Sequence, residues 1–437
     1  MKKKKLIFLT VILIMLTSCM IKNNGHNNKE NLNLIDKSQE FSEEINDGSY
    51  KKENFYSAFT PEAQKNIDKN NLYQFIDHFK TITGPRLKVD KVQVTEQSVL
   101  LVLDNENRKS SEVYTYDNTG HLTNFAMFPG EINHESNKYY SIEPIELQRE
   151  SMIIPGALTM PKNVEKPKIA ILVTGLGPHD MDETIGLSGN KPFKDIATGL
   201  AKNGIATLRY DKSILHGNQR NSINDEYVDD FNAAYEYVQS LNNVDKDNIY
   251  IIAHDTGASL APLLAQGKSI KGIVLMAGSL RNIADIIYDQ TEAVVNESNG
   301  LSEKDKKEQL NKTVQEVHDA KTITKDSKRM PFGINASYWS SFNSIDLKKE
   351  LLNYPGRMLI LQGNNDFETV PEKNYYEYQE VLNNRNNVSY KLFDGLSHIF
   401  TPSDDKSFNM GVYDAPQNVR GDVIFEITKW MNFKEEK

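Results

Sequence analysis

The sequence lacks several features that define large classes of proteins. It has one cysteine, Cys19, in 437 residues, so a disulfide bond within the chain is excluded. Glycine-rich phosphate-binding loops are absent, and the histidines show no spacing typical of metal ligands. A composition of 38% hydrophobic and 25% charged residues excludes general disorder and a polytopic membrane protein. We therefore expect a globular chain without a metal or other cofactor.

Basic residues are also scarce. The formal net charge is −9, and no stripe of Lys and Arg occurs beyond the first few residues. Loss of residues 1–18 would remove four lysines and no acidic residue, and would bring the charge to −13. Because proteins that bind nucleic acids normally present a basic face, a nucleic-acid partner is not expected.

The first residues have the pattern of a bacterial lipoprotein signal. Lysines at residues 2–5 precede an apolar run at 6–16 that is too short to cross about 30 Å of hydrocarbon, which disfavours an uncleaved transmembrane helix. The Leu-Thr-Ser-Cys sequence at residues 16–19 resembles a lipobox, where cleavage precedes a lipid-modified cysteine. We expect residues 1–18 to be removed. Lipids on Cys19 would then anchor the chain to the extracytoplasmic face of the cell membrane.

Next come a tether and a small domain. Residues 19–37 are rich in Asn and Lys and lack apolar periodicity, which is typical of a flexible tether. In residues 38–130, apolar residues at helical spacing come first, and short strands with a turn at 117–120 follow. This pattern predicts a small α+β domain, which resembles the NTF2-like domain that often precedes bacterial hydrolase domains. It contains no catalytic cluster, so we expect a binding or spacer role.

The rest of the chain, residues 145–435, alternates between apolar strands and helices. Five short apolar runs are typical of strands buried on both faces of a parallel sheet: 169–173, 205–208, 249–252, 273–276 and 358–361. Helix-length segments separate them, which predicts a doubly wound α/β sheet. A charged helical segment at about 281–342 interrupts the alternation, either as a cap over a site or as a surface insertion. Its aromatic residues Tyr288, Tyr338 and Trp339 are expected to form its core.

The motif that carries chemistry follows the third of these runs. Residues 253–257 read Ala-His-Asp-Thr-Gly and precede a helix-forming segment, which is the strand, sharp turn and helix of a nucleophile elbow. Small residues at 253 and 257 suit the crowding of that turn. Asp255 stands at the tip. Ser259 lies one helical turn further along and is expected to have a packing role.

Three further segments fall where such an elbow needs them. A Thr-Gly-Leu-Gly-Pro loop at residues 174–178 follows the first run, Asp366 follows the last run, and His398 lies further along. The chain order nucleophile, acid and histidine is that of the α/β-hydrolases. With these motifs, residues 145–435 resemble the bacterial dienelactone-hydrolase and serine-aminopeptidase-like group.

The resemblance implies a site and two departures from its usual form. Asp255 takes the nucleophile position, Asp366 the acid position and His398 the base position. The backbone N–H groups of Leu176 and Thr256 would form the oxyanion hole. The group usually has a histidine at the position of Thr174, which supports the loop, and a serine where this chain has an aspartate.

The aspartate leaves three interpretations open. An aspartate in water, with an ordinary pKa near about 3.9, is already an anion and needs no base to activate it. Attack on a small ester, thioester or amide would give a mixed anhydride, which is the interpretation we favour. A stable ion pair with His398 would instead leave a catalytically inactive binding protein. Attack on an epoxide or alkyl halide is disfavoured, because Thr256 stands where dehalogenases commonly have tryptophan.

Overall fold

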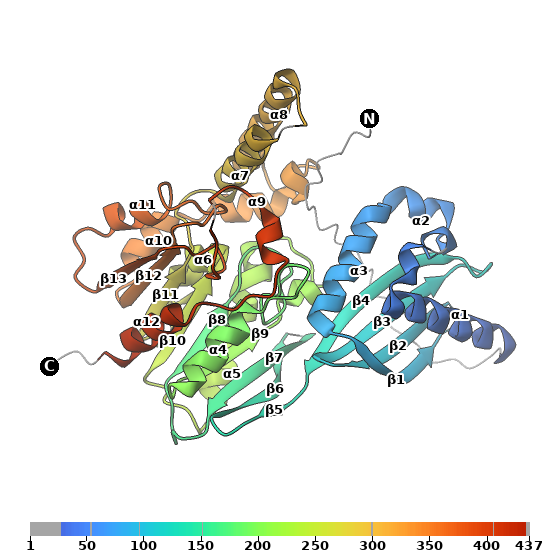
Figure 1. Cartoon of the computed structure of the whole chain (residues 1–437), viewed down its shortest axis with the longest axis horizontal. Helices are drawn as coiled ribbons and strands as arrows, with labels where there is room; N and C mark the ends of the chain where they lie inside the picture. The colour runs from blue at the N-terminus through green and yellow to red at the C-terminus, as the bar shows by residue number, and fades with distance from the viewer. Residues whose placement is uncertain are drawn as a thin grey trace. The chain divides into compact units, whose positions relative to one another are not determined.

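The computed structural model describes residues 28–433 except 53, 54, 96, 151, 299 and 405. The lipoprotein signal and Cys19, predicted from the sequence, lie outside these residues. The chain divides into two compact units, one ending at Asn133 and one beginning at His134 (Figure 1). In the described ranges, no helix combines the length and the apolar character needed to cross a membrane.

The first unit packs helices against one face of an antiparallel sheet. Its helices are α1 (Asn28–Asp47), α2 (Pro61–Asn66) and α3 (Lys69–Thr83), and its strands are β1 (Arg86–Val94), β2 (Ser98–Asn105), β3 (Arg108–Tyr116) and β4 (Leu122–Ile132). The strands pair in chain order, and alternate side chains of β2 and β3 are buried. Aromatic residues, among them Phe55, Tyr114 and Phe125, fill the space between helices and sheet. This is the small α+β architecture that the sequence predicted.

Two features of this unit could not be inferred from local composition or spacing. Helix α1 begins at Asn28, so residues 28–37 are helical and are not the flexible tether expected there. Leu34 and Ile35 pack against the core of the unit, and this tertiary burial outweighs the polar composition of the segment. Phe75, which falls at helical spacing, is 36% exposed because it lies beside the buried stripe of α3.

The second unit is built on a mixed sheet, which has nine strands in the described chain. They are β5 (Glu135–Ser136), β6 (Tyr140–Arg149), β7 (Met152–Pro161), β8 (Ile169–Val173), β9 (Ala206–Tyr210), β10 (Ile249–His254), β11 (Gly272–Met276), β12 (Arg357–Gly363) and β13 (Val388–Phe393). Their order is β13-β12-β11-β10-β8-β9-β7-β6-β5. Strands β8 to β13 are parallel, and β7 is antiparallel to both of its neighbours.

Strands β5, β6, β7 and β13 are the parts of this sheet that the sequence did not indicate. The sheet begins at Glu135, before residue 145, where the region that resembles the α/β-hydrolases was expected to begin. Pro144 and the alternation of charged residues make β6 unlike the buried central strands. The five predicted strands are confirmed as β8 to β12.

Helices cover both faces of the sheet (Figure 1). Helices α4 (Pro192–Lys202) and α12 (Gly421–Asn432) cover one face, and α5 (Asp229–Ser240), α6 (Asp255–Leu264), α10 (Leu347–Asn353) and α11 (Tyr375–Val381) cover the other. Strand β10 shows why such a run is apolar on both faces: Ile251 belongs to one core, whereas Tyr250 and Ile252 belong to the opposite one.

The charged segment near 281–342 forms the helices α7 (Ile283–Glu297), α8 (Glu303–Thr322) and α9 (Ala336–Asn343). They follow β11 and pack on one another. Strand β8 lies between β9 and β10, so the chain order of the sheet reverses there, and ligands of open α/β sheets bind at the carboxyl ends of the strands at such a point. This strand order is that of the α/β-hydrolase fold, and the chain has that fold preceded by a small α+β unit.

Candidate active site

Asp255 occupies the tip of a sharp turn between β10 and α6. Its φ is 51°, in the left-handed region that residues other than glycine rarely adopt. Gly257 makes the turn possible, since a Cβ on it would lie 2.5 Å from the carbonyl oxygen of Thr174. The predicted nucleophile elbow is therefore the local structure of these residues. Strain at such a position is typical of functional turns.

The side chain of Asp255 points at the loop after β8, residues 174–178, which we call the oxyanion loop. The backbone N–H of Leu176 donates a hydrogen bond of 3.0 Å to Oδ2 of Asp255. Gly175 is required beside it, because a Cβ there would lie 2.7 Å from the same oxygen. Thr256 is in the first turn of α6, where backbone N–H groups have no acceptor within the helix. One predicted oxyanion donor is thus already bonded to the elbow side chain.

Asp366 and His398 lie together, as the chain order of the motifs led us to expect. Nδ1 of His398 lies 2.9 Å from Oδ2 of Asp366, and both side chains are buried. Asp366 is itself held from several sides. The backbone N–H groups of Glu368 and Thr369 donate to its Oδ1 at 2.8 and 2.9 Å, and the side chains of Gln362 and Thr369 donate to its Oδ2 at 2.5 and 2.8 Å. This network fixes the carboxylate that orients the imidazole.

Carboxylates surround His398 and set its charge. Burial would lower the pKa of the imidazole, but the negative charges of Asp366, Glu368 and Asp255 outweigh burial and raise that pKa to about 10. Burial also acts to raise the pKa of Asp366, and the imidazolium beside it overcomes this and lowers the pKa. Burial raises the pKa of Glu368, whose carboxylate accepts a hydrogen bond of 2.8 Å from Tyr413. At neutral pH the histidine is therefore a cation that faces acidic groups.

Glu183 and His254 form a second buried acid–histidine pair behind the elbow. Oε2 of Glu183 lies 3.0 Å from Nδ1 of His254, and its Oε1 accepts a hydrogen bond of 2.6 Å from the N–H of Gly175. Nε2 of His254 lies 3.0 Å from the carbonyl oxygen of His398. Burial acts to raise the pKa of Glu183, yet the histidines and the Gly175 amide bring it to about 2. Sequence reasoning missed Glu183, because only its place in a family-like segment marked it.

Other residues considered from the sequence have structural contacts. The hydroxyl of Ser259 donates to the carbonyl oxygen of Asp255 at 3.3 Å and accepts from the N–H of Ser279 at 3.1 Å. Tyr338 and Trp339 are fully buried in α9, whereas Tyr288 is half-buried and donates to Glu292 of its own helix at 3.0 Å. The contacts of Ser259, Tyr338 and Trp339 fit the packing roles expected of them. Within the described residues, no cluster of three His, Cys, Asp or Glu side chains could hold a metal ion.

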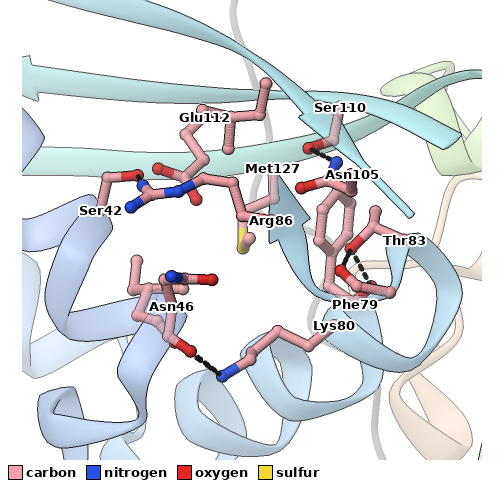
Figure 2. A pocket seen from close by; sticks show the side chains of 13 residues that line it. Ser42, Asn46, Phe79, Lys80, Thr83, Arg86, Asn105, Ser110, Glu112 and Met127 are labelled. Atoms are coloured by element: carbon pink, nitrogen blue, oxygen red, sulfur yellow. Dashed lines mark hydrogen bonds between the residues drawn. The ribbon is translucent and has the colours of Figure 1, made fainter. Parts of the chain in front are cut away.

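A polar cavity in the first unit is too small for a substrate. Its volume is about 30 Å³, which is room for roughly two water molecules. Figure 2 shows Arg86 and Glu112 on one side of it and Lys80 on the other. These groups have protein partners: Arg86 donates to Ser42 at 2.7 Å, Glu112 accepts from Tyr114 at 2.7 Å, and Lys80 donates to the carbonyl oxygen of Ile45 at 2.7 Å. We therefore place the candidate site in the second unit.

Comparison with known proteins finds a relative in sequence and several solved structures that are similar to part of the chain. No protein-family model matches the chain. The esterase EstD of Thermotoga maritima is 28% identical over 370 residues, which cover 83% of this chain and 85% of EstD. The match therefore extends into the first unit. Est1E of Butyrivibrio proteoclasticus has a TM-score of 0.43 at 17% identity and covers 66% of this chain and 98% of its own. FphF, a fluorophosphonate-binding serine hydrolase of Staphylococcus aureus, has a TM-score of 0.39 at 14% identity, and covers 68% of this chain and 100% of its own.

Proposed function

We propose that the second unit hydrolyses carboxylic esters at the site formed by Asp255, Asp366 and His398. The observation that carries the proposal is the 2.9 Å contact between His398 and Asp366, on the loops after β13 and β12, at the same end of the sheet as the elbow after β10. The relative from Thermotoga maritima, which matches most of the chain, is named an esterase. Small esters are the proposed substrates, with thioesters and amides as chemically related alternatives.

The first step uses charges that are already in place. Asp255 adds through its free oxygen to the acyl carbon of the ester, without giving up a proton. His398, a cation at neutral pH, donates its proton to the departing alkoxide, which leaves as the alcohol. The products of this step are a mixed anhydride on Asp255 and a neutral His398. A serine enzyme reaches the same charge arrangement only after the histidine has removed the serine proton.

The second step returns the site to its starting state. Neutral His398 takes a proton from a water molecule, and the hydroxide adds to the carboxyl carbon of Asp255. The resulting oxyanion forms on Oδ2, where the N–H of Leu176 already donates at 3.0 Å. Collapse of this intermediate releases the acyl group as a carboxylate, and Asp255 loses its proton to solvent. The sum is one ester and one water converted to an acid and an alcohol.

The same hydrogen bond favours a second candidate function. A substrate carbonyl oxygen cannot use the Leu176 amide while Asp255 occupies it, so the first step lacks one oxyanion donor. The negative charge of Asp255 also favours the charged form of His398 without a substrate. A catalytically inactive protein that binds a small molecule at this site is therefore the alternative to an esterase.

Isotope labelling separates these functions. An aryl acetate is mixed with a small molar excess of the purified protein in ¹⁸O-labelled water. The peptide that contains Asp255 is then analysed by mass spectrometry. The proposed route puts label into the Asp255 carboxylate, whereas direct attack of water on the ester labels acetate alone and contradicts the route. D255S and H398A variants are assayed in parallel. An inert wild type beside an active D255S variant would establish the binding protein instead.

We further propose that the chain is a lipoprotein, with Cys19 as the lipidated first residue of the mature protein and an NTF2-like first unit that holds the hydrolase away from the membrane. The sequence pattern at residues 1–19 supports the anchor. In bacterial cells, we expect the wild type in the membrane fraction and a C19S variant in the soluble extracytoplasmic fraction. Mass spectrometry of an unmodified Cys19 in the mature protein would overturn the anchor.

A further inference from the structure

A buried cluster of three charged side chains lies against the oxyanion loop. Glu226 is fully buried and Lys212 nearly so, and their charged groups lie 2.8 Å apart. The guanidinium of Arg220 pairs with the other oxygen of Glu226. None of these residues belongs to the site described above, and they come from the segment between β9 and α5.

The cluster holds the backbone on both sides of Leu176. The N–H of Gly177 donates a hydrogen bond of 2.8 Å to Oε1 of Glu226. The carbonyl oxygen of Gly175 accepts hydrogen bonds from the ammonium of Lys212 and, at 2.8 Å, from the hydroxyl of Tyr227. Because the peptide units before and after Leu176 are both fixed, the direction of the Leu176 N–H is fixed as well.

The local backbone explains how two successive side chains reach one loop. Residues Asn224–Val228 form a π-helical turn at the start of α5, and Glu226 and Tyr227 lie in it. Such turns are rare and are frequent at functional sites, because they change the direction of side chains within a helix. Here the turn places a carboxylate on Gly177 and a hydroxyl on Gly175.

Glu226 lies between two cationic side chains, those of Lys212 and Arg220, in a cluster that is largely removed from water. Burial acts to raise the pKa of Glu226, but Arg220 and Lys212 outweigh it and bring the pKa to about 2. A buried ion pair adds little net stability, since desolvation offsets the attraction between its members. What the arrangement does provide is a fixed geometry for the loop that it contacts.

The cluster also contacts the cap. The guanidinium of Arg220 lies 4.3 Å from the centre of the ring of Tyr338, in helix α9. The side chain of Asn335, which caps that helix, donates to the carbonyl oxygen of Arg220 at 2.7 Å. One cluster therefore joins the cap helix to the oxyanion loop.

We propose that Glu226 is a positioning residue that, with Lys212 and Arg220, holds the oxyanion loop in the conformation that directs the Leu176 N–H into the active site. Its catalytic consequence rests on the proposed esterase function. Its structural consequence, protection of the loop backbone, does not depend on turnover.

The test compares two substitutions at one site. E226L keeps the approximate size of the side chain but removes the acceptor for Gly177, whereas E226Q keeps an acceptor oxygen and removes the charge. D230N is the matched control, because Asp230 is equally buried but its contacts are made outside the oxyanion loop: it lies 2.7 Å from Arg149 and accepts a hydrogen bond of 2.7 Å from the N–H of Ser213. Hydrogen–deuterium exchange of residues 174–178 is measured in the full chain of each variant.

We expect exchange in residues 174–178 to become at least about tenfold faster in E226L, to change less in E226Q, and to stay within about twofold of wild type in D230N. Unchanged exchange in E226L, or equal acceleration in D230N, would overturn the proposal. If E226L does not fold, the exchange rates of E226Q and D230N are compared instead. Faster exchange of residues 174–178 in E226Q than in D230N supports the proposal, and equal rates overturn it.

Aryl-ester kinetics in the D255S background provide the second readout. A positioning role lowers kcat in E226L by about tenfold or more while KM stays within about threefold, and E226Q recovers part of kcat. A change confined to KM would contradict the role of Glu226. If D255S and wild type are both inert, the esterase proposal fails, and the exchange experiment still decides the positioning role.

Discussion

Asp255 places its Oδ2 3.0 Å from the backbone nitrogen of Leu176, so the elbow side chain itself occupies a donor of the oxyanion hole. A serine hydroxyl is shorter and would leave that donor open to a substrate oxygen. The carboxylate therefore changes the order of events at the site: the donor assists hydrolysis of an Asp255 intermediate and gives no help to its formation. From this relationship we expect hydrolysis by the wild type to be limited by the first step.

Replacing Asp255 by serine should speed up the first step, which limits hydrolysis by the wild type. We expect D255S to raise kcat/KM for aryl acetates by on the order of a hundredfold, because one oxyanion donor is worth about 10² to 10³ in rate. The measurement is initial-rate hydrolysis from pH 7 to 10, since a serine needs the neutral form of His398 as its base, with D255A as the control that lacks a nucleophile at this position. A folded D255S variant no faster than D255A would argue against a competent Asp366–His398 pair.

The raised pKa of His398 predicts a dependence of stability on pH. The imidazolium is favoured in the folded state, with a pKa of about 10 against an ordinary value of 6.5. The contribution of His398 to the free energy of unfolding is complete below about pH 6.5 and is lost as the pH rises toward 10. The free energy of unfolding then falls by at most about 1.4 kcal/mol per pH unit. Urea unfolding between pH 6 and 10 measures it. A slope in the H398Q variant equal to that of wild type would show that another group is responsible.

Asp366 should be as important for the orientation of the His398 ring as for its positive charge. In D366N the side chain keeps its size but loses the charge that contributes to the raised pKa of His398. We expect kcat to fall on the order of 10³-fold in the D255S background, since the imidazole loses its orienting carboxylate. NMR titration of His398 should show a lower pKa in the same variant. An unchanged pKa and kcat would mean that other groups orient the ring.

The buried pair of Glu183 and His254 should stabilise the elbow. We expect E183Q to reduce the free energy of unfolding by about 3 kcal/mol, because it leaves a buried histidine without its charged partner. The exposed pair of Arg420 and Asp422 is the control, and D422N should cost less than about 1 kcal/mol. The pKa of Glu183 is about 2, so its contribution should be lost as the pH falls from about 4.5 toward 2. An equal loss of unfolding free energy in E183Q and D422N would contradict a stabilising role of the buried pair.

The turn at Gly257 should tolerate no side chain. A Cβ there would lie 2.5 Å from the carbonyl oxygen of Thr174, in a region without room to move. We expect G257A to destabilise the second unit by about 1–3 kcal/mol. G421A is the matched control, since a Cβ on Gly421 meets no atom within 4 Å. Thermal unfolding of both variants gives the comparison. A G257A variant as stable as G421A would show that the oxyanion loop can move away from the added methyl group.

The sequence by itself determined the central sheet and the order of the site. Strand β8 and residues 249–253 of β10 are continuously apolar because both faces are covered, and such short runs predict buried parallel strands. The elbow could be found because Gly257 and Ala253 satisfy a local steric requirement. Strand β6 could not be found, since it is not continuously apolar and contains Pro144.

Only the tertiary structure decided what the aspartate meets. Its hydrogen bond with Leu176 joins residues far apart in the chain, and the contact of Glu226 with Gly177 does so as well. Such contacts leave no local pattern, because they depend on which loops the strand order brings to one edge of the sheet. The sequence therefore determined that an aspartate stands at a nucleophile elbow. The folded chain decided that this aspartate rests in the oxyanion hole beside a charged histidine.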